Sequence, residues 1–153
     1  MKTESSKLDI EAFLAEPKIA LAGVSRSGKK FGNHAARMLL EKGYEVLPIH
    51  PEANELEGQK CYSSVSELPT DVKAALLVVP PRETEKLIPE LSARGIEKIW
   101  MQQGAESAEA IEMCNKLGLR AVGGECVFMF TEPVGGGHAF HRWIWKVLGK
   151  LPD

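Results

Sequence analysis

The alternation of apolar runs with amphipathic segments is the feature that most constrains the fold of this chain. Five short apolar runs recur between residues 19 and 122, and their continuous apolar character indicates strands that are buried on both faces. The runs are Ile19–Val24, Val46–Ile49, Ala74–Val79, Ile96–Met101 and Leu119–Val122. Alternating strands and helices predict an α/β domain, a Rossmann-like doubly wound parallel sheet of about five strands.

The segments between the runs have apolar faces at helical spacing. These faces are Ala35, Met38 and Leu39 in the first segment, Leu87, Ile88 and Leu91 in the second, and Ala110, Met113, Cys114 and Leu117 in the third. A short N-terminal helix around Phe13 is predicted to end before Pro17. The pattern Ser64-x-x-Glu67 predicts a capping box for a further short helix. Helices can therefore cover both faces of the sheet.

The length and charge of the chain disfavour several classes of protein. A chain of 153 residues with 44% hydrophobic residues suits one domain with a substantial core. The net charge of -2 provides no overall field that would attract nucleic acid. No run of about 18 apolar residues predicts a membrane span, and three cysteines without C-x-x-C spacing argue against a disulfide framework. We expect a cytoplasmic protein that binds neither nucleic acid nor membranes.

Three consecutive glycines at positions 135–137 indicate a hinge before a C-terminal amphipathic helix. We expect the sheet domain to span residues 1–134, and the hinge and helix to span residues 135–153. The apolar stripe of this helix needs cover from its own domain or from a second copy in a homodimer. His138 and His141 lie three positions apart on it, but no third ligand accompanies them, so we expect no metal site.

The segment Lys18–Gly32 runs an apolar strand into a Gly/Ser-rich loop that carries three cations. Such a loop delivers backbone N–H groups and the positive end of the following helix to an anion. The pattern Gly23-x-Ser25-x-x-Gly28 partly matches the dinucleotide fingerprint G-x-G-x-x-G, with a serine in the middle position. Helix-like sequence begins at Asn33, which predicts a longer loop than in nucleotide-cofactor sites. We expect this loop to bind phosphate groups.

Residues that directly follow the other apolar runs are the remaining candidates, because ligands of open parallel sheets lie beyond the carboxyl ends of the strands. Gly, Pro and amide side chains dominate these positions. The candidate binding residues are Gly23, Val24, Ser25, Arg26, Gly28, Lys29, Lys30 and Gly32 in the first loop, and His50, Pro51, Val79, Pro80, Arg82, Gln102, Gln103, Gly104 and Cys126 after the later strands.

The residues alone leave two ligands open. NAD sites usually have an acidic residue about 20 positions beyond the glycines, whereas the second run here ends in His50-Pro51. A ligand whose ribose carries a phosphate remains compatible, because His50, Arg26 or Lys29 can pair with that group. Coenzyme A and NADP both meet this condition.

Five pieces of the chain, in order, resemble one known family. They are GVSRSGKKFG after the first run, IHP with a following Gly58-Gln59-Lys60, VVPP, WMQQGA, and GGECVF around Cys126. The chain from Leu8 to Phe130 resembles the coenzyme A binding domains that are similar to the N-terminal domain of the succinyl-CoA synthetase alpha subunit. The family commonly has Asn where this chain has His50.

The resemblance implies that Ser25–Gly32 cradles the phosphates, and that Pro80 and residues 102–104 flank the pantetheine and adenosine parts. A ligase of this family also needs further domains, for which 153 residues leave no room. The resemblance therefore implies a small stand-alone protein that binds coenzyme A or acyl-CoA, as a carrier or a sensor of CoA or redox state, without catalysis of its own.

Catalytic patterns are missing from the predicted strand ends: there are no paired carboxylates and no G-x-S-x-G elbow. Cys126 follows the last run, where a thiol-ended ligand can approach it, but no flanking cation favours a reactive thiolate. We favour a packing role for it, as for Cys61 and Cys114. The alternative functions are an NADP-dependent oxidoreductase and a regulatory interaction module that acts through the C-terminal helix.

Overall fold

The computed structural model describes residues 7–127. The predicted hinge and C-terminal helix at 135–153, together with His138 and His141, lie outside the described residues, as does the expected domain boundary at 134.

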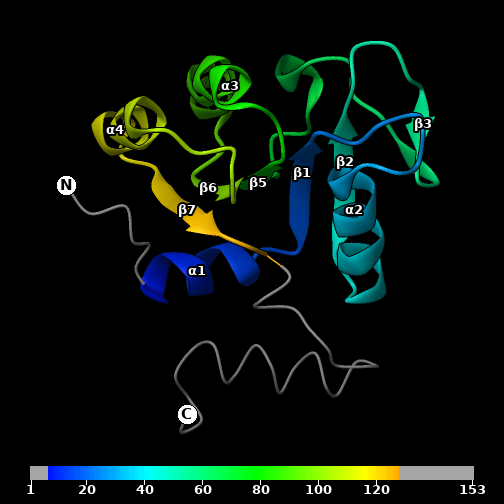
Figure 1. Cartoon of the computed structure of the whole chain (residues 1–153), viewed down its shortest axis with the longest axis horizontal. Coiled ribbons are helices and arrows are strands. Elements are labelled where there is room, and N and C mark those ends of the chain that lie inside the picture. Colours follow the sequence, from blue (N-terminus) through cyan, green and yellow to red (C-terminus); the bar gives the residue numbers. More distant parts are fainter. Residues whose placement is uncertain (1–6, 128–153) are drawn as a thin grey trace, which may run out of the picture.

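Five parallel strands form the main sheet, in the order β2-β1-β5-β6-β7 (Figure 1). The strands are β1 (Lys18–Ala22), β2 (Glu45–Ile49), β5 (Ala74–Leu77), β6 (Lys98–Gln102) and β7 (Arg120–Glu125). The chain steps outward from β1 to β2, returns past β1 to β5, and then continues outward on the other side. The predicted five-strand Rossmann-like sheet is confirmed.

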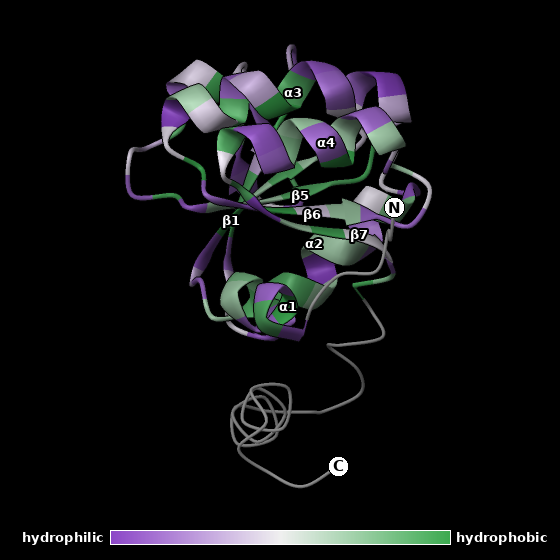
Figure 2. Cartoon of the chain, turned by 90° about the vertical axis from the view of Figure 1, so that its left-hand side faces the viewer, coloured by the Kyte–Doolittle hydropathy of each residue, from purple (hydrophilic) through white to green (hydrophobic). Residues whose placement is uncertain are grey.

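Helices cover both faces of this sheet (Figure 2). The helices are α1 (Lys7–Leu14), α2 (Phe31–Glu41), α3 (Pro81–Arg94) and α4 (Ala108–Leu117). Helices α1 and α2 lie on one face, while α3 and α4 lie on the other. A separate cluster of buried apolar side chains lies under each layer. Both faces of the sheet are therefore buried, as the continuous apolar runs predict.

The predicted N-terminal helix is present as α1 and packs on the sheet. Phe13 is fully buried, and its ring contacts Trp100 edge to face with centroids 5.3 Å apart. The Tyr44 hydroxyl donates to the Leu14 carbonyl at 2.7 Å, which fixes the end of the helix. Burial raises the pKa of Tyr44 above its usual range. Within residues 7–127, no helix is both long and apolar enough to cross a membrane.

The connection from β2 to β5 differs from the prediction. It contains a hairpin of two short strands, β3 (Glu55–Leu56) and β4 (Gln59–Lys60), that the sequence did not indicate. The predicted short helix is a 3-10 turn, η1 (Val65–Glu67). The prediction of a capping box is wrong, because the Ser64 hydroxyl bonds the Ser66 hydroxyl at 2.9 Å and does not cap the turn.

Several element boundaries also differ. Helix α2 begins at Phe31 rather than Asn33, so Gly32 lies in the helix and the preceding loop is shorter than expected. Val24 and Val79 lie beyond the ends of β1 and β5, although both belong to apolar runs. Gln102 is the last residue of β6 rather than a residue after it. Apolar character therefore extends past the last paired residue at two strand ends.

Candidate functional site

The carboxyl edge of the sheet has a switch point between β1 and β5, because the chain leaves these two neighbouring strands in opposite directions. Gly23 follows β1 and Val78 follows β5 at this point. A side chain on Gly23 would place its Cβ 2.2 Å from the Val78 carbonyl oxygen, and the φ of Gly23 is +112°. Only glycine fits here, so the two strand ends lie in direct backbone contact.

Helix α2 starts directly against this backbone. A Cβ on Gly32 would lie 2.2 Å from the Gly23 carbonyl oxygen. A Cβ on Gly28 would meet only Arg37 Nη2, at 3.5 Å, although its φ of +75° favours glycine. The glycine that lets the helix approach the strand is therefore Gly32, which lies outside the Gly23-x-Ser25-x-x-Gly28 pattern.

Asn33 holds the two ends of the β1–α2 loop together, and it is only 1% exposed. Its Oδ1 accepts from the backbone N–H of Ser25 at 3.1 Å and of Lys30 at 3.3 Å. Its Nδ2 donates to the Ser25 carbonyl at 2.8 Å. The sequence analysis treated this residue only as the start of the helix and missed its role. The one signal available in the sequence is an amide side chain directly after the Gly/Ser-rich loop.

The loop also bonds to itself through two serines. The Ser25 hydroxyl accepts from the Ser27 N–H and donates to the Ser27 hydroxyl, both at 2.9 Å. The Ser27 hydroxyl accepts from the Lys29 N–H at 3.2 Å. Several amides that the sequence analysis expected to face a ligand thus have partners within the loop. These hydrogen bonds give the loop a defined shape, and its positive charge comes from exposed side chains.

These cations are Arg26, Lys29 and Lys30, and all three are exposed. Within the part of the chain that the structure describes, Lys29 and Lys30 have no carboxylate partner. Arg26 Nη2 lies 2.6 Å from the Glu52 carboxylate. Two uncompensated positive charges therefore lie at the start of α2, where the helix dipole also favours an anion.

The turn after β2 brings His50 and Glu52 to the same edge. His50 Nδ1 accepts from the backbone N–H of Glu52 at 3.1 Å and of Ala53 at 3.0 Å. The turn thus occupies Nδ1, and no hydrogen bond joins Nε2 to another residue between 7 and 127. The neighbouring Pro51 is exposed. The sequence analysis missed Glu52. It compared only His50-Pro51 with the acidic residue that NAD sites usually have after the second strand.

A cavity of about 280 Å³ lies beyond the ends of β5 and β6. Its lining residues are Val78, Val79, Pro80, Gln102, Gln103, Gly104 and Ala105, which include five of the predicted candidates. Arg82 does not line it and lies exposed in the first turn of α3. The Gln102 carboxamide is 5% exposed and accepts from the Val127 N–H at 3.0 Å, so its side chain anchors the segment after β7.

The cysteines occupy different environments. Cys61 and Cys114 are buried, as expected for packing residues, and burial raises the pKa of the Cys114 thiol to about 11. Cys126, directly after β7, is half-buried, which is more exposed than the packing role predicted for it. Among residues 7–127, no three His, Cys, Asp or Glu side chains come together as a metal site.

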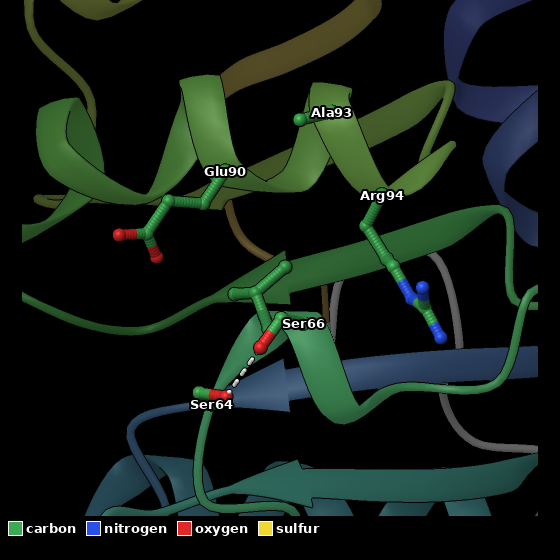
Figure 3. Close-up of a pocket in the computed structure, with 6 residues that line it drawn as sticks. Ser64, Ser66, Glu90, Ala93 and Arg94 are labelled. Atoms are coloured by element: carbon green, nitrogen blue, oxygen red, sulfur yellow. Dashed lines mark hydrogen bonds between the residues drawn. The ribbon is translucent and has the colours of Figure 1, made fainter.

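A second cavity, of about 400 Å³, lies between η1 and the last turns of α3 (Figure 3). Ser64, Ser66, Glu90 and Arg94 are among its lining residues. The guanidinium of Arg94 donates to the Leu68 carbonyl, with Nε at 2.7 Å. The residues that line this cavity include none of the predicted site residues.

A family model described as a CoA binding domain matches residues 17–132, a range that contains the loop, the β2 turn and the cavity. The chain belongs to the CoA-binding domain family. The resemblance noted from the five sequence pieces is therefore confirmed, and with it the assignment of this CoA-binding domain to the Rossmann-like fold.

Relatives of two kinds accompany this family match. The alpha subunit of an ADP-forming acetate–CoA ligase II from Pyrococcus furiosus is 31% identical over an alignment of 120 residues, and the match covers 71% of this chain and 26% of the relative. This chain thus matches about a quarter of the length of that subunit. The solved structure of a conserved hypothetical protein from Pyrococcus furiosus is 44% identical, with a TM-score of 0.70 over 73% of this chain and 97% of that one. A hypothetical protein from Pyrococcus horikoshii has 30% identity and a TM-score of 0.76, over 83% of this chain and 90% of that one.

Proposed function

We propose that this CoA-binding domain binds coenzyme A or an acyl-CoA at the carboxyl edge of its sheet. The phosphates lie against the β1–α2 loop and the cations Arg26, Lys29 and Lys30. The pantetheine and adenosine parts run along the ends of β5 and β6, where Pro80, Gln103 and Gly104 line the smaller cavity. The ligand is larger than this cavity, so it extends over the open edge.

One observation carries the proposal: the backbone contact between Gly23 and Val78. It joins the cationic loop after β1 to the cavity after β5 at the switch point of the sheet. An elongated ligand with phosphates in its middle and an uncharged arm needs both features side by side. The family model and the acetate–CoA ligase relative support coenzyme A as that ligand rather than NADP.

The proposed role is that of a carrier or sensor that does not catalyse a reaction by itself. The two Pyrococcus chains, matched over 90% or more of their own length, support a separate protein of this size. The acetate–CoA ligase subunit extends well beyond the matched region. The cysteines, two of them buried, give no support to a thiol reaction, so the proposal includes none.

Calorimetric titration of the full chain with coenzyme A, dephospho-coenzyme A and NADP tests the proposal. Tighter binding of coenzyme A than of NADP is the expected result. Dephospho-coenzyme A serves as the matched ligand, because it lacks only the 3′-phosphate. Failure of coenzyme A to bind at millimolar concentration, or preferential binding of NADP, would contradict the proposal.

A further inference from the structure

Glu57 has a strained backbone for its residue type. Among residues 7–127 it is the only non-glycine with a positive φ, at +52°, and Gly58 follows at +75°. The two residues form the turn of the β3–β4 hairpin, since Leu56 pairs with Gln59. Turns with two positive φ values favour Asn, Asp or Gly. An outlier of this kind points to a role for its side chain.

The side chain of Glu57 reaches α2. Its Oε2 accepts from Asn33 Nδ2 at 2.8 Å, and its Oε1 accepts from Arg37 Nε at 2.8 Å. Arg37 Nη2 adds a third bond to Oε2 at 3.0 Å. The Glu57 side chain is 14% exposed. Both carboxylate oxygens are thus used within the protein, and the Arg37 charge compensates the carboxylate.

The two partners of Glu57 are the residues that hold the β1–α2 loop. Asn33 bonds the backbone at Ser25 and Lys30, as described above, and Arg37 Nη2 donates to the Gly28 carbonyl at 2.6 Å. The carboxylate is therefore one side chain away from both ends and the middle of the loop. Figure 1 shows this loop passing beside the hairpin.

We propose that Glu57 is a positioning residue for the phosphate-binding loop. It does not touch the ligand; it aligns the Asn33 amide and the Arg37 guanidinium, and through them sets the loop in the shape that receives phosphates. The β3–β4 hairpin and the loop then act as one preformed unit, which lowers the ordering cost of binding. This inference rests on the proposed binding of coenzyme A.

The variant Glu57→Gly removes the carboxylate and supplies the residue that the turn prefers, so the hairpin should still form. In the ligand-free protein, amides 25–30 should exchange with deuterium about tenfold faster than in wild type, as expected when a charged hydrogen-bond anchor is lost. The affinity for coenzyme A should fall by about tenfold for the same reason. The thermal midpoint should change little, because glycine relieves the positive-φ strain at this position and so offsets the hydrogen bonds that are lost.

The matched pair Glu57→Gln and Glu55→Gln distinguishes the loss of the Glu57 contacts from a general effect of charge, because each variant removes one negative charge from the same hairpin. Glu57→Gln should weaken coenzyme A binding and loosen the loop, while Glu55→Gln should do neither. A purely structural role predicts a lower thermal midpoint with unchanged affinity and unchanged loop exchange in the Glu57 variants. That pattern would overturn the inference.

The two parts of the experiment also keep this inference apart from the proposed function. If wild type does not bind coenzyme A, the proposed function fails, and exchange of amides 25–30 still decides whether Glu57 sets the loop. If wild type binds and the Glu57 variants bind equally well, the proposed function stands and the positioning role is wrong.

Discussion

Arg26 and Glu52 form an ion pair between the β1–α2 loop and the turn after β2, with Nη2 2.6 Å from Oε1. The two side chains are 62% and 69% exposed, and exposed pairs of this kind contribute only about 0 to 1 kcal/mol. The guanidinium can therefore exchange its partner for a phosphate at little cost. Under the proposed function, Glu52 competes with the phosphates of the ligand for Arg26.

Removing the charge of Arg26 and removing the charge of Glu52 should have opposite effects on the affinity for coenzyme A. We expect Arg26→Ala to weaken coenzyme A binding by about 1 to 3 kcal/mol, as for a charged hydrogen bond, and to weaken dephospho-coenzyme A less. Glu52→Gln should strengthen coenzyme A binding by up to about 1 kcal/mol, because it releases the guanidinium. Titration calorimetry with both ligands measures these changes. Equal losses for the two ligands in Arg26→Ala would refute a contact between Arg26 and the 3′-phosphate.

Lys29 carries one of the uncompensated charges of the loop, so Lys29→Ala should also weaken coenzyme A binding by about 1 to 3 kcal/mol. Raising the salt concentration should reduce this difference between wild type and variant, because the group is exposed and screened. Lys116→Ala is the control, since it removes the same charge from the last turn of α4, a helix on the face of the sheet opposite α2 (Figure 2). A control that loses as much affinity would indicate a general charge effect instead.

Gly32→Ala should disrupt the start of α2. Its methyl group would lie 2.2 Å from the Gly23 carbonyl oxygen, and neither backbone can move without shifting β1 or the helix. We expect the free energy of unfolding to fall by about 2 to 4 kcal/mol, measured by urea denaturation. Gly58→Asn is a control of known geometry: its φ of +75° suits Asn, and nothing lies within 4 Å of the added Cβ. Its unfolding free energy should stay close to that of wild type.

The carboxylate of Glu57 makes the stability of the protein depend on pH. Hydrogen bonds from Arg37 and Asn33 hold its pKa below the ordinary value of 4.5. A lowered pKa means that the stabilisation is fully present above pH 4.5 and is lost as the pH falls through the lower folded-state value. Urea denaturation should therefore show a deficit for Glu57→Gln at pH 7 that narrows at pH values well below 4.5. A deficit that is independent of pH would contradict this expectation.

The cysteines should differ in their reaction with iodoacetamide. Cys126 is half-buried, whereas Cys61 and Cys114 are buried and burial raises the pKa of both thiols. Native protein at pH 8 should first gain a single carbamidomethyl group, and peptide mapping should place it on Cys126. Slower labelling in the presence of coenzyme A would be expected if the ligand passes near β7. First labelling at Cys114 would contradict the burial order.

The parallel main sheet and the helices on both of its faces could be predicted from the sequence, because each strand of that sheet carries a continuous apolar run and each helix has an apolar face. The order of the strands was not predicted, because the apolar runs do not say which strands are neighbours. The hairpin was not predicted either, since β3 and β4 have only two residues each and show no measurable periodicity. Apolar runs also fail to mark strand ends: Val24 and Val79 are apolar because they are packed in or against the core, not because they are paired.

Within the candidate site, sequence indicates the strand ends but not the internal supports. Ser25, Arg26 and Gly104 lie next to recognisable strand ends, so their place at the carboxyl edge could be predicted. The contact of Asn33 with Glu57 joins residues 24 positions apart, and no local sequence pattern predicts it. The sequence also placed Gln102 at the edge, yet the direction of its side chain depends on its hydrogen bond with Val127, which lies 25 positions away.

The Asn33, Arg37 and Glu57 contacts define how the loop could be transplanted. A protein engineer who grafts only residues 23–32 onto another α/β scaffold would keep the Ser25 and Ser27 contacts but would leave behind the three side chains that hold the loop from outside it. The smallest portable cassette runs from β1 through β4, residues 18–60, because it contains the glycines, the helix and the hairpin together.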